Sequence, residues 1–193
     1  MNYGTIIVDP PWPYNDEGGP TGNAGRGRPG KKIVQVGIAN HYPPMSVDEL
    51  RRLPVGQIAA PDAVLFLWTT NAFMVEAHEL AVGWGFRPNT ILTWGKVKAD
   101  RDEPSMKTGH WFRGATEHIV FAVRGRPPRP SVALPTLHLY PRSNHSTKPS
   151  LFVVLAEQVG PPPRIELFAR RVRPGWDRWG NEVESTIRLE VGQ

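Results

Sequence analysis

Residues 5–12, Thr-Ile-Ile-Val-Asp-Pro-Pro-Trp, decide the fold of this chain. Residues 5–8 are β-branched, which is typical of a strand, and the two prolines that follow cannot continue a strand's hydrogen-bond ladder. The stretch therefore predicts a strand that ends in a stiff loop carrying Asp9 and Trp12. Open α/β sheets bind their ligands at the carboxyl ends of their strands, so we expect the active site here.

Working outward from this stretch, strand and helix patterns alternate along the chain. Apolar runs predict strands at residues 64–68, 90–94, 118–123, 165–168 and, less strongly, 186–191. Helical spacing occurs at residues 46–52, 71–82 and 148–159. The first of these opens with a Ser46/Glu49 capping-box pattern, and the last has Pro149 at a first-turn position. This alternation predicts one α/β domain over residues 1–193, with a mostly parallel sheet and helices on both faces.

The composition limits the kinds of site and partner that we expect. The net charge of +5 favours a polyanion such as nucleic acid, although an arginine-rich proteome would explain it equally well. The absence of cysteine excludes disulfides, thiolate zinc sites and cysteine nucleophiles, and the six histidines lack metal-ligand spacing, so no metal is expected. We find no export signal and no run of about 18 apolar residues, so we expect a cytoplasmic protein without membrane contact.

A glycine- and arginine-rich stretch covers residues 15–40 and shows little periodicity. It carries the basic side chains Arg26, Arg28, Lys31 and Lys32. We interpret it as a mobile loop that faces an anion or solvent, and a disordered insertion remains the alternative.

The loop after the first strand suits the methylation of an amine on a base. The exocyclic amine of adenine is a poor nucleophile, so a catalyst has to hold its hydrogens and aim its nitrogen. Asp9 and the Pro10 carbonyl supply two acceptors, Pro10 and Pro11 stiffen the loop, and Trp12 offers a ring face to an extruded base. The alternative is a proline-stiffened turn with an aromatic plug.

This tetrapeptide resembles the Asp-Pro-Pro-Trp signature of amino-methyltransferases, and further segments resemble the MT-A70 family in that family's order. The segments are residues 41–45, 65–70, 94–96, 109–113, 117–118, 124–125, 145–149, 165–170 and 179–182. The family includes messenger-RNA adenosine methyltransferases with bacterial and phage relatives. The resemblance implies a Rossmann-like fold that uses S-adenosylmethionine, in a permuted order with the catalytic motif before the cofactor motifs.

The resemblance also implies roles for individual residues. The catalytic residues would be Asp9, Pro10, Pro11 and Trp12, and those toward the cofactor Asp9, Lys148, Glu166, Arg170, Asn181 and Glu182. Lys148 would pair with the cofactor's carboxylate, Glu166 and Arg170 would lie along its ribose and methionine, and Asn181 and Glu182 would hydrogen-bond its ribose or adenine. Substrate contacts would come from Trp12 and from a lid formed by Tyr42, Arg26, Arg28, Lys31 and Lys32. Glu117 and His118 would either orient the catalytic loop or form a satisfied interior pair.

These observations predict an adenine-N6 methyltransferase that converts S-adenosylmethionine to S-adenosylhomocysteine. We expect DNA as the substrate, because a compact, arginine-rich catalytic domain is typical of bacterial and phage enzymes. Two alternatives are RNA adenosine as the substrate and a non-catalytic nucleic-acid-binding subunit, against which the intact Asp9 and Trp12 argue. The chain begins close to the first strand, so we expect part of the cofactor pocket to be open or completed by a partner. A homodimer and a partner subunit both stay open.

Overall fold

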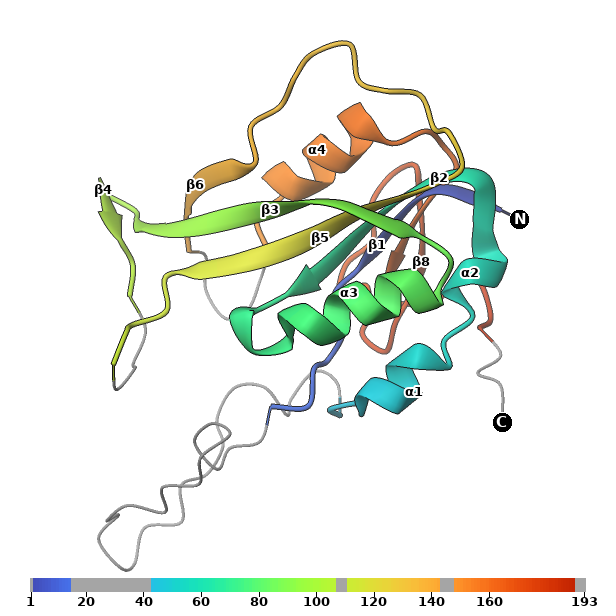
Figure 1. Ribbon diagram of the computed structural model, residues 1–193, viewed down its shortest axis with the longest axis horizontal. Coiled ribbons are helices and arrows are strands. Elements are labelled where there is room, and N and C mark those ends of the chain that lie inside the picture. Colours follow the sequence, from blue (N-terminus) through green and yellow to red (C-terminus); the bar gives the residue numbers. More distant parts are fainter. Residues whose placement is uncertain (1, 15–42, 107–110, 143–147, 190–193) are drawn as a thin grey trace, which may run out of the picture.

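The computed structural model describes residues 2–14, 43–106, 111–142 and 148–189. The predicted loop at 15–40 and Tyr42 therefore lie outside the described residues, together with Arg26, Arg28, Lys31 and Lys32. The helices and strands are β1 (Tyr3–Val8), α1 (Val47–Arg51), α2 (Val55–Ile58), β2 (Ala59–Thr69), η1 (Asn71–Phe73), α3 (Met74–Gly83), β3 (Arg87–Lys98), β4 (Arg101–Pro104), β5 (Thr116–Arg124), β6 (Leu137–Pro141), α4 (Leu151–Val159), β7 (Arg164–Leu167) and β8 (Trp176–Trp179) (Figure 1).

The strands form one sheet with the order β4-β3-β5-β2-β1-β7-β8, and β6 pairs with β3. Strand β1 lies inside the sheet between β2 and β7 and is parallel to both, so that Val8 is level with Leu67 of β2 and Leu167 of β7. Strands β7 and β8 are also parallel, as are β3 and β6. This confirms the predicted α/β fold with its mostly parallel sheet. Two strands depart from that pattern: β5 runs antiparallel to both β2 and β3, and the edge strand β4 runs antiparallel to β3.

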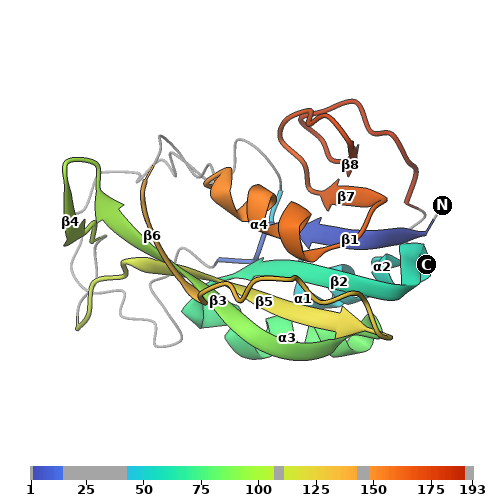
Figure 2. The ribbon, with the colours of Figure 1, turned by 90° about the horizontal axis from the view of Figure 1, so that it is seen from above.

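Helices cover both faces of the sheet, as predicted: α4 lies on one face, and α1, α2 and α3 lie on the other (Figure 2). Strand β1 shows how the sequence achieves this. Ile7 packs in a cluster with Phe152 of α4, whereas Ile6 is in the cluster that contains Leu50 of α1 and Leu80 of α3. A strand covered on both faces needs apolar residues at consecutive positions, and all six residues of β1 are buried.

The helix starts follow the local sequence, with one correction. Ser46 caps α1 with both halves of the predicted capping box, since its backbone N–H donates to Glu49 and its hydroxyl accepts from the Glu49 N–H. The prediction that Pro149 lies in a helical first turn is wrong, because α4 begins at Leu151 after Ser150. In the described part of the chain, no helix combines the length and apolar character needed to cross a membrane.

The predicted strand at residues 186–191 is wrong as far as the structure describes it. Residues 186–189 belong to no strand, and Thr186 instead bonds Arg178 through its backbone and its hydroxyl. The edge of the sheet is formed by β8, in which Trp176 is level with Arg164 of β7. Thr186 therefore braces β8, and residues 186–189 do not extend the sheet.

A candidate active site at the carboxyl edge of the sheet

Several strand ends meet at one edge of the sheet and bring the predicted site residues together. Because β1, β2 and β7 are parallel and in register, Asp9 after β1 and Phe168 after β7 leave the sheet side by side. The antiparallel strand β5 starts at this same edge, where His118 is level with Thr69 of β2. The reversal of β5 thus delivers Glu117 to the edge at which Asp9 lies.

The loop after β1 is held by its own backbone. The carbonyl of Pro10 accepts the N–H of Trp12 at 2.9 Å, and the carbonyl of Pro11 accepts the N–H of Met45 at 2.9 Å. Because Pro10 and Pro11 have no backbone N–H, they take part in the loop's backbone hydrogen bonds only as acceptors, through these carbonyls. A carbonyl oxygen has two lone pairs, so the Pro10 carbonyl can accept a further hydrogen bond besides that from Trp12.

Trp12 has a different place from the one predicted. Its side chain is 4% exposed, and its indole N–H donates to the Trp68 carbonyl at 3.0 Å. One ring face stacks on Phe73, with 5.0 Å between ring centroids and 11° between planes. The expected open ring face for a base is not what the structure shows. Trp12 closes the core beneath the catalytic loop, because its indole finds both an apolar neighbour and a hydrogen-bond acceptor there.

Tyr14, which the sequence prediction missed, is the exposed aromatic residue of this loop. It is 38% exposed, its ring packs edge-on against Phe73, and its hydroxyl is 3.0 Å from that of Thr70. Its pKa is raised chiefly by burial, and the charges of Glu117 and Asp9 raise it further. The hydroxyl is therefore within electrostatic range of the charged groups of the site. The only signal in the sequence was an aromatic residue two positions after Trp12.

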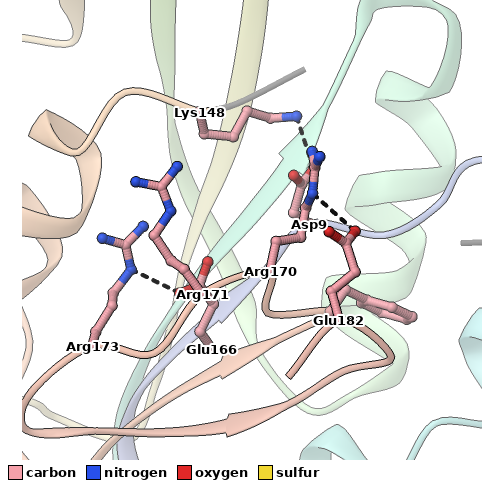
Figure 3. A pocket seen from close by; sticks show the side chains of 8 residues that line it. Asp9, Lys148, Glu166, Arg170, Arg171, Arg173 and Glu182 are labelled. Carbon is pink, nitrogen blue, oxygen red and sulfur yellow. Dashed lines mark hydrogen bonds and ion pairs between the residues drawn. The ribbon is translucent and has the colours of Figure 1, made fainter. Parts of the chain in front are cut away.

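A pocket opens beside Asp9, and most of the predicted cofactor residues line it (Figure 3). Its lining residues are Asp9, Lys148, Glu166, Phe168, Arg170, Arg171, Arg173 and Glu182. Asn181 precedes Glu182 but is not part of the lining. Two ion pairs order the wall: Arg173 Nε donates to Glu166 Oε2 at 2.9 Å, and Arg170 Nε donates to Glu182 Oε1 at 3.1 Å. Arg173 was not predicted, because nothing distinguishes it from the surface arginines around it in the sequence.

Phe168 forms the turn that leads from β7 into this pocket. Its φ of 59° lies in the left-handed region, which a phenylalanine rarely adopts, and its ring packs edge-on against Trp179. Such backbone strain typically costs about 1–3 kcal/mol and recurs at functional sites. The strained turn sends Arg170 back along the pocket instead of continuing the strand.

Lys148 lies between two carboxylates at the heart of the site. Its Nζ is 3.0 Å from Asp9 Oδ1 and 3.3 Å from Glu117 Oε2, and it lies over the ring of Trp68. The second oxygen of Glu117 accepts from Lys96 of β3. Lys148 therefore couples Asp9 to a pair of residues on β5 and β3.

The surroundings shift the pKa values of these groups in different directions. Removal from water raises the pKa of Asp9, and Lys148 only partly opposes that rise. Burial would also raise the pKa of Glu117, but Lys148 and Lys96 outweigh it and lower that pKa. For Lys148, burial favours the neutral amine, but Asp9 and Glu117 outweigh it and raise the pKa. Lys148 is therefore the cation that opposes the rise in the pKa of Asp9 caused by burial.

Comparisons with known proteins agree with this arrangement. The MT-A70 family model matches residues 3–182. The Type II methyltransferase M.MunI of Mycoplasma sp is 30% identical over 196 residues, which cover 98% of this chain and 81% of that protein. The N(6)-adenine-specific methyltransferase METTL4 of Mus musculus is 28% identical, over 94% of this chain and 37% of its own length. For the human N(6)-adenosine-methyltransferase catalytic subunit METTL3, the identity is 28%, over 97% of this chain and 29% of that protein. Because the family model matches nearly the whole chain, from residue 3 to residue 182, this chain belongs to the MT-A70 family.

Proposed function

We propose that this chain transfers a methyl group from S-adenosylmethionine to the exocyclic N6 amine of adenine in DNA. The enzyme class, an adenine-N6 methyltransferase, follows from membership of the MT-A70 family. The observation that carries the proposal is the position of Asp9, in a proline-stiffened loop at the mouth of a charged pocket. A carboxylate acceptor beside such a pocket is what the methylation of an amine requires.

The chemistry of the pocket fits S-adenosylmethionine, which has a carboxylate, an ammonium group, ribose hydroxyls and an adenine. Lys148 would take the carboxylate, while Glu166 and Glu182 would accept from the hydroxyls and the ammonium group. Arg170 holds Glu182 in place, and Asn181 would complete the ribose or adenine side. When bound, S-adenosylmethionine supplies an electrophilic methyl group and leaves as S-adenosylhomocysteine.

Asp9 and Pro10 would orient the adenine amine through its two N–H groups. Asp9 Oδ1 is turned toward Lys148, so Oδ2 would accept one N–H and the Pro10 carbonyl the other. Both acceptors point negative charge at the nitrogen, and they stabilise the positive charge that grows on it as the new N–C bond forms. The extra proton then leaves the nitrogen for Asp9 or for water. No covalent enzyme intermediate is needed.

Tyr14 would take the base-stacking role that the sequence assigned to Trp12. Its ring is exposed at the mouth of the site, whereas that of Trp12 is stacked on Phe73. Stacking of a base on an aromatic side chain is worth about 1–3 kcal/mol. Trp12 and Phe73 would then act as the platform that keeps the ring of Tyr14 in place.

DNA is supported over RNA by the share of each relative's length that this chain covers. The chain covers 81% of M.MunI, which is named a Type II methyltransferase, and 29% of METTL3, which is named an adenosine-methyltransferase subunit. The net charge of +5 is consistent with either polymer. RNA is therefore the second candidate, supported by the name of METTL3.

The test is transfer of labelled methyl from S-adenosylmethionine to matched single- and double-stranded DNA and RNA, followed by nucleoside mass spectrometry. We expect N6-methyladenine in DNA. N6-methyladenosine in RNA alone would favour the second candidate. Measurable cofactor binding without transfer to any of the four polymers would contradict an active enzyme and favour the non-catalytic subunit.

Arg170→Ala should weaken cofactor binding more than it slows methyl transfer. The change removes the donor that holds Glu182 at the pocket wall, and we expect Kd for S-adenosylmethionine to rise about tenfold, since a hydrogen bond to a charged group is worth about 1.5–3 kcal/mol. Calorimetry measures Kd, and Arg51→Ala is the matched control, because Arg51 also pairs with a carboxylate but lies on α1. An unchanged Kd would remove Glu182 from the proposed cofactor site.

A further inference from the structure

Four charged side chains form a row along the carboxyl edge of the sheet: Lys96 of β3, Glu117 of β5, Lys148 before α4 and Asp9 after β1. Lys96 Nζ donates to Glu117 Oε1, Glu117 Oε2 is 3.3 Å from Lys148 Nζ, and that nitrogen is 3.0 Å from Asp9 Oδ1. The signs alternate along the row. Each of the two inner groups, Glu117 and Lys148, therefore has an opposite charge on both sides.

Lys96 has no role in the proposed methyl-transfer mechanism, although burial of its positive charge is energetically unfavourable. Its side chain is 4% exposed and lies over the ring of Trp94, which is level with Glu117 on the neighbouring strand. Burial of a charge is unfavourable unless the charge is paired and hydrogen-bonded. By contrast, Lys98, two residues along the same strand, pairs with Glu103 in solvent. Strand β3 thus buries one lysine and aims it at the carboxylate that holds Lys148.

We propose that Glu117, backed by Lys96, is a positioning residue for methyl transfer, and this inference rests on the proposed function. An ammonium group has three N–H donors. In the row, one donor of Lys148 faces Asp9 and a second faces Glu117, which leaves the third for the cofactor's carboxylate. The contact with Glu117 thus determines which N–H of Lys148 faces which partner. Without it, Lys148 would be tethered to Asp9 alone and would be free to swing over both oxygens of the catalytic carboxylate.

Because the charges in the row shift one another's pKa values, this role should be detectable in the dependence of kcat on pH. The groups that act on Glu117 are Lys96 and Lys148, which lower its pKa, and its carboxyl in turn acts on Asp9, Tyr14 and His118. Loss of the Lys96 charge should raise the pKa of Glu117, so that Glu117 takes up its proton at higher pH. Loss of the Glu117 charge should lower the pKa of Asp9, because a neighbouring negative charge is removed while Lys148 stays.

The experiment compares kcat against pH for the wild type, Lys96→Met, Glu117→Gln and the double variant. We expect the acidic limb to move up by about one pH unit in Lys96→Met, and down in Glu117→Gln, whose plateau kcat should also fall about tenfold. The double variant should match Glu117→Gln, because Lys96 acts through Glu117. A purely structural pair would lower thermal stability in both variants and move neither limb.

Lys98→Met is the matched control, since it removes a lysine from the same strand and from a similar but exposed ion pair, and it should leave the profile unchanged. A second readout needs no cofactor: a ¹³C NMR titration of the Glu117 carboxyl, assigned with Glu117→Gln, should show a higher pKa in Lys96→Met. Superimposed profiles for the wild type and Lys96→Met, or full kcat in Glu117→Gln, would overturn the inference. A wild type that transfers no methyl group would instead contradict the proposed function, while an unshifted titration would refute the Lys96–Glu117 coupling by itself.

Discussion

Asp9→Ala is expected to lower kcat for methyl transfer at least about 100-fold, the usual cost of losing one preorganised group that stabilises transition-state charge. The change removes the carboxylate that would accept an N–H of the adenine amine, and it leaves Lys148 paired with Glu117 only. Single-turnover methyl transfer with a saturating cofactor concentration measures the effect. Cofactor Kd should change much less than kcat, because the ion pairs that order the pocket wall, Arg170–Glu182 and Arg173–Glu166, do not involve Asp9.

The matched control for this change is Asp48→Ala. Asp48 also pairs with a basic side chain, Arg51, but lies in solvent on α1. Its removal should leave both kcat and Kd unchanged. Strong residual activity in Asp9→Ala would refute the catalytic assignment of the loop.

Trp12→Ala should destabilise the protein by about 3–5 kcal/mol, the range found when a buried tryptophan or phenylalanine is truncated. It removes the ring stacked on Phe73 and leaves the Trp68 carbonyl without its indole donor. Urea denaturation monitored by circular dichroism measures the change. Trp12→Phe keeps an aromatic ring but loses the hydrogen bond and part of the buried indole volume, so its cost should be smaller, about 1–3 kcal/mol.

Tyr14→Ala tests whether Tyr14, rather than Trp12, is the ring on which the base stacks. Tyr14 is partly exposed, so its removal should leave the denaturation midpoint almost unchanged while it weakens binding to the substrate strand. If Trp12→Ala were as stable as the wild type and lost only substrate affinity, the original interpretation of Trp12 as the stacking ring would be right.

The sequence was sufficient to predict the elements whose residues carry their own local reason. The β-branched run before Asp9 became β1, the Ser46/Glu49 pattern became a capping box, and the helix after Lys148 became α4. Each of these signals lies within a few residues of the structure that it predicts. The place of Asp9 also followed, because proline ends a strand wherever the strand lies in the sheet.

What could not be predicted depends on partners far away in the chain. Nothing near Trp12 shows that Phe73 will cover its ring, and nothing near Lys96 shows that it will meet Glu117 from the adjacent strand. The antiparallel direction of β5 has the same cause, since an apolar run does not specify its orientation. For this reason the interpretation of Glu117 stayed open at the level of sequence, and Tyr14 and Arg173 were missed.

The position of β1 between β2 and β7 has a consequence for how the protein folds. Ile6 is level with Ile165 of β7, so the strand that carries the catalytic loop pairs with a segment almost 160 residues later in the chain. Pairing over such a separation requires a large loop to close, which slows folding. During synthesis, β1 cannot form its pairing with β7 until β7 has left the ribosome. The segment that carries Asp9 is therefore made long before it reaches its final surroundings, and a nascent chain that stops before β7 has no completed pocket.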